Sequence, residues 1–252
     1  MHGEAGCAGW AEGPEGCTVR RERGGPWIGL AAGFFYPIGW LSGRPRFEGL
    51  ENIPRTGGAV VAANHLSHID PIYSGLAVHL AGRVPRFLAK DGLWRVPVLG
   101  TVLRATAQIP VFRGTADAKA SLRDGVTALQ DGKVLVVYPE GTISRDPARW
   151  PMHPRTGVAR LALGSGAPVV PMVHWGTHAV LDGYAKRYRP LPRTTVTVRC
   201  GPPVDLSAYR DRPVDAAVLR EVTDLVMGRV RDLLAEVRAE PAPAGFYRRT
   251  DA

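Results

Sequence analysis

The stretch AANHLSHIDPI, at residues 62–72, places an asparagine, two histidines, a serine and an Asp-Pro step between two apolar segments. His65 and Asp70 are five residues apart. On one continuous helix they would face away from each other, about 140° apart. They can meet only if the chain turns between them and a helix begins at Asp70. The Asp70 carboxylate would then hold Nδ1–H of His65, and the other ring nitrogen would be a general base near neutral pH.

Other interpretations of this stretch stay open. Asp70 followed by Pro71 is a typical helix start, so Asp70 can also be an N-cap, and a carboxylate has oxygens for both roles. His68 is a second candidate for the base. A metal site of His65, His68 and Asp70 would need further ligands, and no zinc-binding helix motif occurs elsewhere in the sequence. Ser67 lacks the Gly-x-Ser-x-Gly turn of a nucleophilic serine and suits a turn hydrogen bond.

Three further stretches combine an apolar run with residues suited to binding. VVYPEGTISRD runs from a predicted strand into Glu140 and Gly141, where a glycine lets a substrate approach the backbone closely. An ordinary turn has the same pattern. IPVFRGT places Arg113 directly after an apolar strand, where a guanidinium group can fork onto a phosphate. APVVPMVHWG is an apolar strand with Pro171, and it suits a wall better than catalysis.

The elements that would position these residues alternate between apolar strands and helices. Strands are predicted at GAVVAAN, RFLAK, the end of ATAQIPVF, KVLVVYP, APVVPMVHWG and TTVTVRCG. Helices are predicted at PIYSGLAVHLAG, DAKASLRDGVTALQDG, GVARLALGSG and DAAVLREVTDLVMGRVRDLLAEVRAE. This order predicts an α/β fold in a single domain, with a mostly parallel buried sheet flanked by helices. In such a sheet the chemistry gathers at the carboxyl ends of the strands.

The composition is that of an ordinary globular protein, with 45% hydrophobic and 22% charged residues in 252. Lysine and arginine number 32 against 23 acidic residues, which gives a net charge of +9. Such a balance favours an anionic partner: nucleic acid, an acidic membrane surface or a phosphate-bearing substrate. A solvated basic surface would give the same charge. Cys7, Cys17 and Cys200 form no metal-ligand spacing or disulfide framework, which favours a reducing compartment.

The longest apolar run, WIGLAAGFFYPIGWLS at 27–42, is shorter than the roughly 20 residues that a spanning helix needs. Arginines precede it, as in a signal peptide, but no small-residue cleavage site follows. Five aromatic residues between basic flanks favour a helix lying in the membrane interface, and a first core helix is the alternative. We therefore expect a flexible tail at 1–25, a membrane-interface segment at 26–44, the main domain at 45–240 and a flexible tail at 241–252.

NHLSHID, VFRGT, YPEGTISR and VVPMV, in this order, resemble the four sequence blocks of the glycerophospholipid acyltransferase superfamily. Within it, the chain is most similar to the 1-acylglycerol-3-phosphate acyltransferases. The resemblance covers roughly 45–205 and includes LAKDGLWRVPVLG and RTGVARLAL between the blocks. Two departures stand out: Tyr138 replaces the usual phenylalanine, and the second block lacks the common Ile-Asp before its arginine.

The resemblance implies a glycerol-phosphate acyltransferase-like fold and an O-acyltransferase of phospholipid biosynthesis. The acyl group would move from acyl-CoA or acyl carrier protein to the free hydroxyl of 1-acylglycerol 3-phosphate, giving phosphatidate. His65, held by Asp70, would be the general base, and no covalent enzyme intermediate would form. The substrate-binding residues that the resemblance implies are Arg113, Glu140, Gly141, Thr142, Arg145 and Arg155, with Pro171 in the wall of the acyl site.

No metal and no bound cofactor are implied, because the acyl thioester enters as a substrate. The expected partners are a lysophospholipid acceptor, the acyl donor and a membrane surface, with the protein peripheral on the cytoplasmic face of the cell membrane. Nucleic acid is not expected, because the aromatic residues cluster at 27–40 instead of interleaving with Lys and Arg. Two alternatives remain: the same chemistry on glycerol 3-phosphate, a lyso-aminolipid or a glycolipid, and a non-catalytic basic membrane- or nucleic-acid-binding module.

Overall fold

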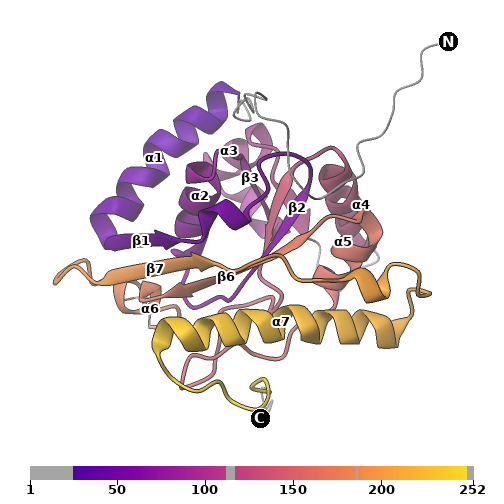
Figure 1. Cartoon of the computed structure of the whole chain (residues 1–252). Helices are drawn as coiled ribbons and strands as arrows, with labels where there is room; N and C mark the ends of the chain where they lie inside the picture. Colours follow the sequence, from indigo (N-terminus) through magenta and orange to yellow (C-terminus); the bar gives the residue numbers. More distant parts are fainter. Residues whose placement is uncertain (1–24, 112–116, 186, 249–252) are drawn as a thin grey trace, which may run out of the picture.

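The computed structural model describes residues 25–111, 117–185 and 187–248, so the expected tail at 1–25 lies almost wholly outside the described residues. Its centre is a seven-stranded sheet of order β1-β7-β6-β2-β5-β3-β4 (Figure 1). The strands are β1 (Arg44–Glu48), β2 (Ala59–Ala63), β3 (Pro85–Lys90), β4 (Ile109–Val111), β5 (Val134–Val137), β6 (Val169–Trp175) and β7 (Thr195–Cys200). Only the β6–β7 pairing is antiparallel. The predicted α/β fold with a mostly parallel sheet is confirmed.

Helices cover both faces of this sheet (Figure 1). They are α1 (Pro26–Ser42), α2 (Asp70–Leu80), α3 (Leu99–Ala105), α4 (Asp117–Gln130), α5 (Gly157–Ser165), α6 (Thr177–Val180) and α7 (Ala216–Arg238). Three short 3-10 turns, η1 (Leu50–Asn52), η2 (Asp91–Arg95) and η3 (Ser207–Tyr209), complete the elements of the described residues. The sequence patterns predicted α2, α4, α5 and α7, and they missed β1, α3 and α6.

The strand β2 shows why the sheet is buried on both sides. All five of its residues are buried. Val60 and Ala62 pack in the core formed with α4, α5 and α7, whereas Val61 and Ala63 pack in the core formed with α2. Successive side chains of a strand point to opposite faces, so a continuous apolar run is what a doubly covered strand requires.

Arg83, just beyond the end of α2, binds the turns at the amino-terminal ends of two central strands. Its guanidinium group donates to the carbonyl oxygens of Pro54, Gly57 and Gly132, at 2.5, 2.8 and 2.6 Å. These carbonyls belong to the turns that lead into β2 and β5. Gly57 and Gly132 have φ angles of 72° and 76°, a conformation that favours glycine. The charge is only 3% exposed, and its forked donors match three backbone acceptors.

The helix α1 has one packed and one exposed face. Gly39 lies against α2, where an added Cβ would stand 2.5 Å from Leu76, and Tyr73 donates to its carbonyl at 2.9 Å. The large apolar side chains exposed on α1 are Trp27, Leu30, Phe34, Trp40 and Leu41. Among the described residues, no helix has the length and apolar character to cross a membrane. The segment therefore combines features of both predicted alternatives, a core helix on one side and an apolar surface on the other.

Residues 241–248, assigned from the sequence to a flexible tail, contact the main domain. Tyr247 forms a bridge with Met152, and its carbonyl accepts from His153 N at 2.9 Å. Phe246 lies under the guanidinium group of Arg231, 5.6 Å from the ring centre. The last four residues, 249–252, are outside the described part of the chain.

Candidate active site

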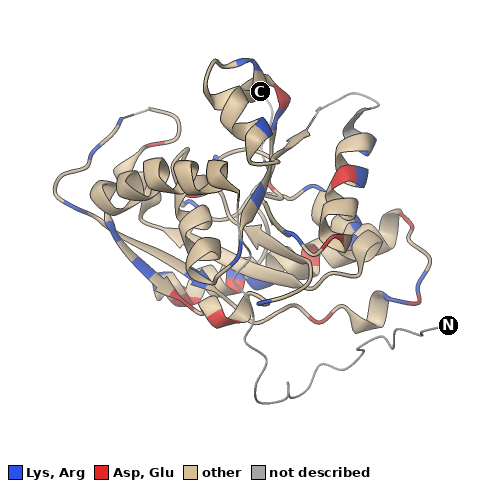
Figure 2. Ribbon diagram, turned by 90° about the horizontal axis from the view of Figure 1, so that it is seen from above, with Lys and Arg blue, Asp and Glu red and all other residues tan. Residues whose placement is uncertain are grey.

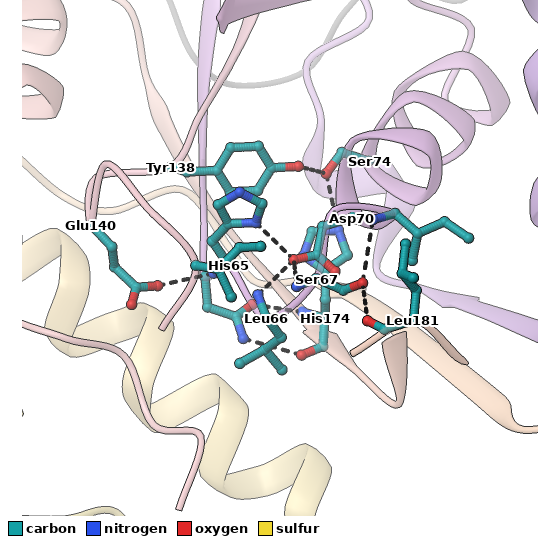
Figure 3. Close-up of polar contacts among 12 residues, drawn as sticks. His65, Leu66, Ser67, Asp70, Ser74, Tyr138, Glu140, His174 and Leu181 are labelled. Carbon is teal, nitrogen blue, oxygen red and sulfur yellow. Dashed lines mark hydrogen bonds and ion pairs between the residues drawn. The ribbon is translucent and has the colours of Figure 1, made fainter. Parts of the chain in front are cut away.

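Asn64 directs the chain from β2 into the turn that carries the predicted chemistry. Its side-chain amide donates to the carbonyl of His174 at 3.1 Å and accepts from the N–H of the same residue at 2.7 Å. These two bonds extend the pairing of β2 with β6 by one side chain beyond the end of the strand. The main chain is thereby free to turn, and His65 follows at the carboxyl end of the sheet (Figure 3).

His65 and Asp70 meet across this turn. His65 Nδ1 lies 2.9 Å from Asp70 Oδ2, and the same oxygen accepts from the backbone N–H groups of Leu66 and Ser67 at 2.6 and 2.8 Å. Asp70 is fully buried, whereas the His65 side chain is 16% exposed. The carboxylate thus holds the turn closed and orients a ring that is partly exposed to solvent.

The expected division of the two Asp70 oxygens between a helix cap and His65 is wrong. The helix α2 begins at Asp70 itself, and no side chain caps its first turn. One oxygen takes all three donors, which lie in the turn before the helix, because the side chain points back toward His65. Oδ1 has no hydrogen-bond partner among the described residues.

The protonation state of the pair follows from its surroundings. Burial opposes the charged form of Asp70, but the hydrogen bond from His65 holds its pKa below the usual value. Thr177 adds to this lowering, although its hydroxyl lies outside hydrogen-bond geometry. Asp70 is therefore ionised, and Nδ1 of His65 carries the hydrogen that it accepts. Nε2 then has the lone pair that a general base needs.

Glu140 ties this turn to the neighbouring loop. Its Oε1 accepts from His65 N, and its Oε2 accepts from Met152 N, both at 2.9 Å. Burial raises the pKa of this carboxyl to about 8, even though the two N–H donors favour the charged form. Both oxygens serve the backbone, so Glu140 positions His65 from within the protein.

Gly141 and Arg155, both in the predicted substrate-binding set, lie together next to Glu140. Gly141 has a φ of 72°, and an added Cβ would stand 3.3 Å from Arg155 Nε. Arg155 N also donates to the carbonyl of Pro139 at 2.9 Å. Thr142 and Arg155 are exposed. The guanidinium group therefore lies beside the turn that follows β5, at the same edge of the sheet as His65.

Arg145, four residues after Gly141 in the same loop, lines a shallow pocket. Its guanidinium group lies 5.5 Å from the centre of the Tyr184 ring, and its Nε donates to the Tyr184 hydroxyl at 3.3 Å. The other residues that line the pocket are Ser144, Asp146, Pro147 and Arg149. Arg149 is also paired with Asp182, at 3.6 Å. The pocket thus offers positive charge beside an aromatic ring.

Arg113 and Pro171 complete the predicted set. Arg113 lies outside the described residues. Pro171 is buried in the middle of β6, where an added Cβ on Gly201 would stand 3.1 Å from its Cγ and 3.2 Å from Leu233 of α7. It therefore packs on the face of the sheet that α7 covers.

The competing interpretations of the first stretch separate clearly. Ser67 Oγ donates to the carbonyl of Leu181 at 2.6 Å and accepts from Ile69 N at 3.3 Å, which is the expected turn role. His68 is exposed, and no hydrogen bond joins it to Asp70 in the described structure. Within residues 25–111, 117–185 and 187–248, no cluster of His, Cys, Asp and Glu has the arrangement of a metal site.

The sequence reasoning missed a group of side chains behind the dyad of His65 and Asp70. The Tyr138 ring stacks on His65 with 4.3 Å between ring centres and 22° between planes. Its hydroxyl lies 2.8 Å from Ser74 Oγ, which in turn lies 2.9 Å from His174 Nε2. One signal was available: Ser74 stands four residues after Asp70, and residues four apart share a helix face. His174 gave none, because it is a single polar residue in an apolar strand.

Comparison with known proteins gives a consistent result. A family model described as Acyltransferase matches residues 44–175, more than half of the chain. A 1-acyl-sn-glycerol-3-phosphate acyltransferase of Limnanthes douglasii is 30% identical over 179 residues, which cover 70% of this chain but only 60% of that protein. A chloroplastic 1-acyl-sn-glycerol-3-phosphate acyltransferase of Arabidopsis thaliana is 28% identical over 157 residues, 62% of this chain and 40% of that protein.

One solved structure shares the fold over most of the chain. The 1-acyl-sn-glycerophosphate (LPA) acyltransferase PlsC from Thermotoga maritima aligns with a TM-score of 0.66 and 24% sequence identity, covering 86% of this chain and 81% of that one. At this identity the likeness establishes the arrangement of strands and helices.

Proposed function

The chain belongs to the Acyltransferase family, and we propose that it moves a fatty acyl group from an acyl thioester to the free hydroxyl of 1-acylglycerol 3-phosphate. The observation that carries this proposal is the pairing of His65 Nδ1 with the buried carboxylate of Asp70 at 2.9 Å. A base held in this way, at the carboxyl end of a parallel strand, suits the deprotonation of a hydroxyl group. The 1-acylglycerol-3-phosphate acyltransferases among its relatives support this choice of acceptor.

The proposed reaction needs one base and no covalent intermediate. His65 Nε2 takes the proton of the acceptor hydroxyl as its oxygen attacks the thioester carbonyl. The resulting tetrahedral intermediate collapses with cleavage of the C–S bond, and the thiolate leaves with the proton that His65 returns. Asp70, ionised and 2.9 Å from Nδ1, stabilises the imidazolium ion that exists between these steps. Ser67 takes no part, because its hydroxyl is directed to the carbonyl of Leu181.

Three of the described residues are candidates for binding the phosphate of the acceptor. Arg155 and Thr142 are exposed beside Gly141, and Arg145 is exposed in the next pocket. A guanidinium group can bind a phosphate through two parallel N–H donors. We assign the phosphate to this edge, with Arg113 as a further ligand from the resemblance. Glu140 acts here through the backbone of His65, not through contact with substrate.

We further propose peripheral binding to the cytoplasmic face of the membrane through α1. This helix has no charged residue and is drawn wholly in tan in Figure 2. The loop beside it is basic and apolar: Arg193 donates to the carbonyls of Trp40 and Gly43, and Leu191 is 76% exposed. Arginines near an anionic leaflet add about 1 kcal/mol each, and exposed aromatic side chains favour the headgroup level.

Transfer assays with radiolabelled acyl-CoA and acyl-carrier protein test this function. Each donor is combined with 1-acylglycerol 3-phosphate, glycerol 3-phosphate and a lyso-aminolipid. We expect labelled phosphatidate from the first acceptor, and none from a His65→Gln variant that folds normally. Labelled product from another acceptor alone would replace the proposed substrate. No transfer with any pair, together with binding to anionic vesicles, would favour a non-catalytic binding module.

A further inference from the structure

A polar chain crosses the core directly behind the dyad. It runs from the Tyr138 hydroxyl through Ser74 Oγ to Nε2 of His174, with successive distances of 2.8 and 2.9 Å (Figure 3). The three residues come from different elements: the end of β5, α2 and β6. Ser74 and His174 are both fully buried. These three hydrogen-bonded side chains therefore join three parts of the fold next to His65.

His174 is a costly residue at this place unless it has a role. It lies on the face of β6 that also carries Val170 and Met172, in the core under α2. A buried polar group costs free energy unless it is hydrogen-bonded, and an apolar side chain would fill the same space at no such cost. Burial lowers the pKa of its imidazole, so the ring is neutral. Among the described residues its side chain has one hydrogen-bond partner, Ser74.

Because His174 is neutral, each hydrogen bond between Tyr138, Ser74 and His174 can have one donor and one acceptor. Neutral imidazole donates at one nitrogen and accepts at the other, so Nε2 can serve Ser74 in either tautomer. The Ser74 hydroxyl has one hydrogen to give and can accept at its oxygen, so it can bridge His174 and the Tyr138 hydroxyl in both cases. Each hydrogen bond in such a buried network restricts the orientation of its members.

What this network orients is the ring on which His65 is stacked. The Tyr138 and His65 ring centres are 4.3 Å apart, and their planes differ by 22°. With its hydroxyl held by Ser74, the Tyr138 side chain cannot swing about its Cα–Cβ bond without breaking a partly buried hydrogen bond. A fixed aromatic face also attracts the positive charge that forms on His65 during proton transfer.

We propose that His174 is a positioning residue for His65, acting through Ser74 and Tyr138 to hold the imidazole in its reactive orientation. This inference rests on the proposed acyl transfer. Asp70 fixes one edge of the His65 ring in its plane, and the Tyr138 face limits rotation out of that plane. The two contacts together define the direction of Nε2, which neither does alone.

The first test compares His174→Leu with His174→Gln. Glutamine can place an amide near the position of imidazole Nε2, whereas leucine leaves Ser74 without that partner. We expect His174→Leu to lower kcat by about 10- to 100-fold, the usual effect of misplacing a catalytic group, with KM for both substrates little changed. His174→Gln should restore most of kcat. Tyr138→Phe should resemble His174→Leu, and the double variant should be no worse than the poorer single variant.

The matched control is His153→Gln. It changes an exposed histidine that is not part of the Tyr138–Ser74–His174 network and should leave kcat unchanged. A folded His174→Leu with the kcat of the wild type would overturn the proposal. So would losses in His174→Leu and Tyr138→Phe that multiply in the double variant, because two residues on one route cannot act independently.

A second measurement does not depend on activity. The NMR signals of the His65 ring, identified by their loss in His65→Gln, should show the ring-current shift of the stacked Tyr138 in the wild type. We expect this shift to shrink in His174→Leu and to persist in His174→Gln. An unchanged shift in His174→Leu would refute the positioning role. If the wild type lacked transferase activity, the proposed function would fail, while this spectrum would still decide on the orientation of His65.

Discussion

The two ends of α2 each hold a buried charge, and the two charges serve different purposes. Arg83, beyond the carboxyl end of the helix, is 3% exposed and donates to three backbone carbonyls where strands begin. Asp70, at the amino end, is fully buried and accepts from two backbone N–H groups where a strand has ended. Its third partner is the side chain of His65.

The comparison shows that a buried charge marks a functional site only through its partners. Both groups meet the general requirement that a buried ion be paired or hydrogen-bonded. Arg83 donates to three backbone oxygens, which have no chemistry to offer a substrate. Asp70 accepts a hydrogen bond from the imidazole of His65, a side chain that is partly exposed to solvent. The proposed catalytic end is therefore marked by its side-chain partner, His65.

The largest expected effect separates the charge of Asp70 from its shape, at the proposed catalytic end of α2. Asp70→Asn keeps an oxygen for Leu66 N and Ser67 N but removes the negative charge beside His65. We expect kcat/KM to fall by about 10²–10⁴-fold, the usual contribution of a positioned general base, with a modest loss of stability. Steady-state kinetics and urea denaturation measure the two quantities. Near-normal turnover would make Asp70 a structural charge like Arg83.

The second prediction concerns the structural end and has the opposite outcome. Arg83→Met leaves the carbonyls of Pro54, Gly57 and Gly132 without the guanidinium donors, and we expect the free energy of unfolding to fall by about 3 kcal/mol. Activity per folded molecule should be unchanged at low temperature. Arg83→Lys keeps the charge without the fork and should recover only part of the stability. A selective loss of kcat in folded Arg83→Met would contradict the division between the two ends.

A third prediction uses Glu140, a buried carboxyl that positions His65 through the backbone. Its pKa is raised from 4.5 to about 8, so the folded protein binds more protons than the unfolded chain between these values. Stability from this residue is therefore greatest at low pH and falls as the pH rises through this window. In urea denaturation, the stability advantage of wild type over Glu140→Gln should shrink from pH 5 to pH 8. A constant difference would show that Glu140 is already ionised at pH 5.

The smallest expected effect is that of Ser67→Ala, at the catalytic end but outside its chemistry. The variant loses the bond to the Leu181 carbonyl, which costs about 1 kcal/mol of stability. The kcat should change little, because the proposed reaction forms no ester on the enzyme. Loss of activity comparable with that of His65→Gln, or a burst of covalently bound acyl group in the wild type, would instead identify Ser67 as a nucleophile.

The predictable part of the molecule was local in sequence. Apolar strand runs, the Asp70-Pro71 helix start and the five-residue spacing of the dyad needed no distant contact to be interpreted. The role of Glu140 depends on a bond to His65 N, 75 residues away, and His174 meets Ser74 across 100 residues. The edge strand β1 was missed because its sequence, RPRFE, is charged and contains proline, and its partner β7 lies far along the chain.

The arrangement on α2 also bears on thermal behaviour. Asp70 begins the helix, Ser74 lies in its second turn, and Arg83 follows its end by three residues. The His65–Asp70 pair, the bond of Ser74 to His174 and the backbone contacts of Arg83 therefore all depend on the position of α2. Such a unit opens cooperatively, because no part of it can detach without exposing a buried polar group. Heating should therefore abolish activity and melt the central sheet over the same narrow range of temperature. The protein would then have no loosened form that keeps part of the proposed activity between its native and unfolded states.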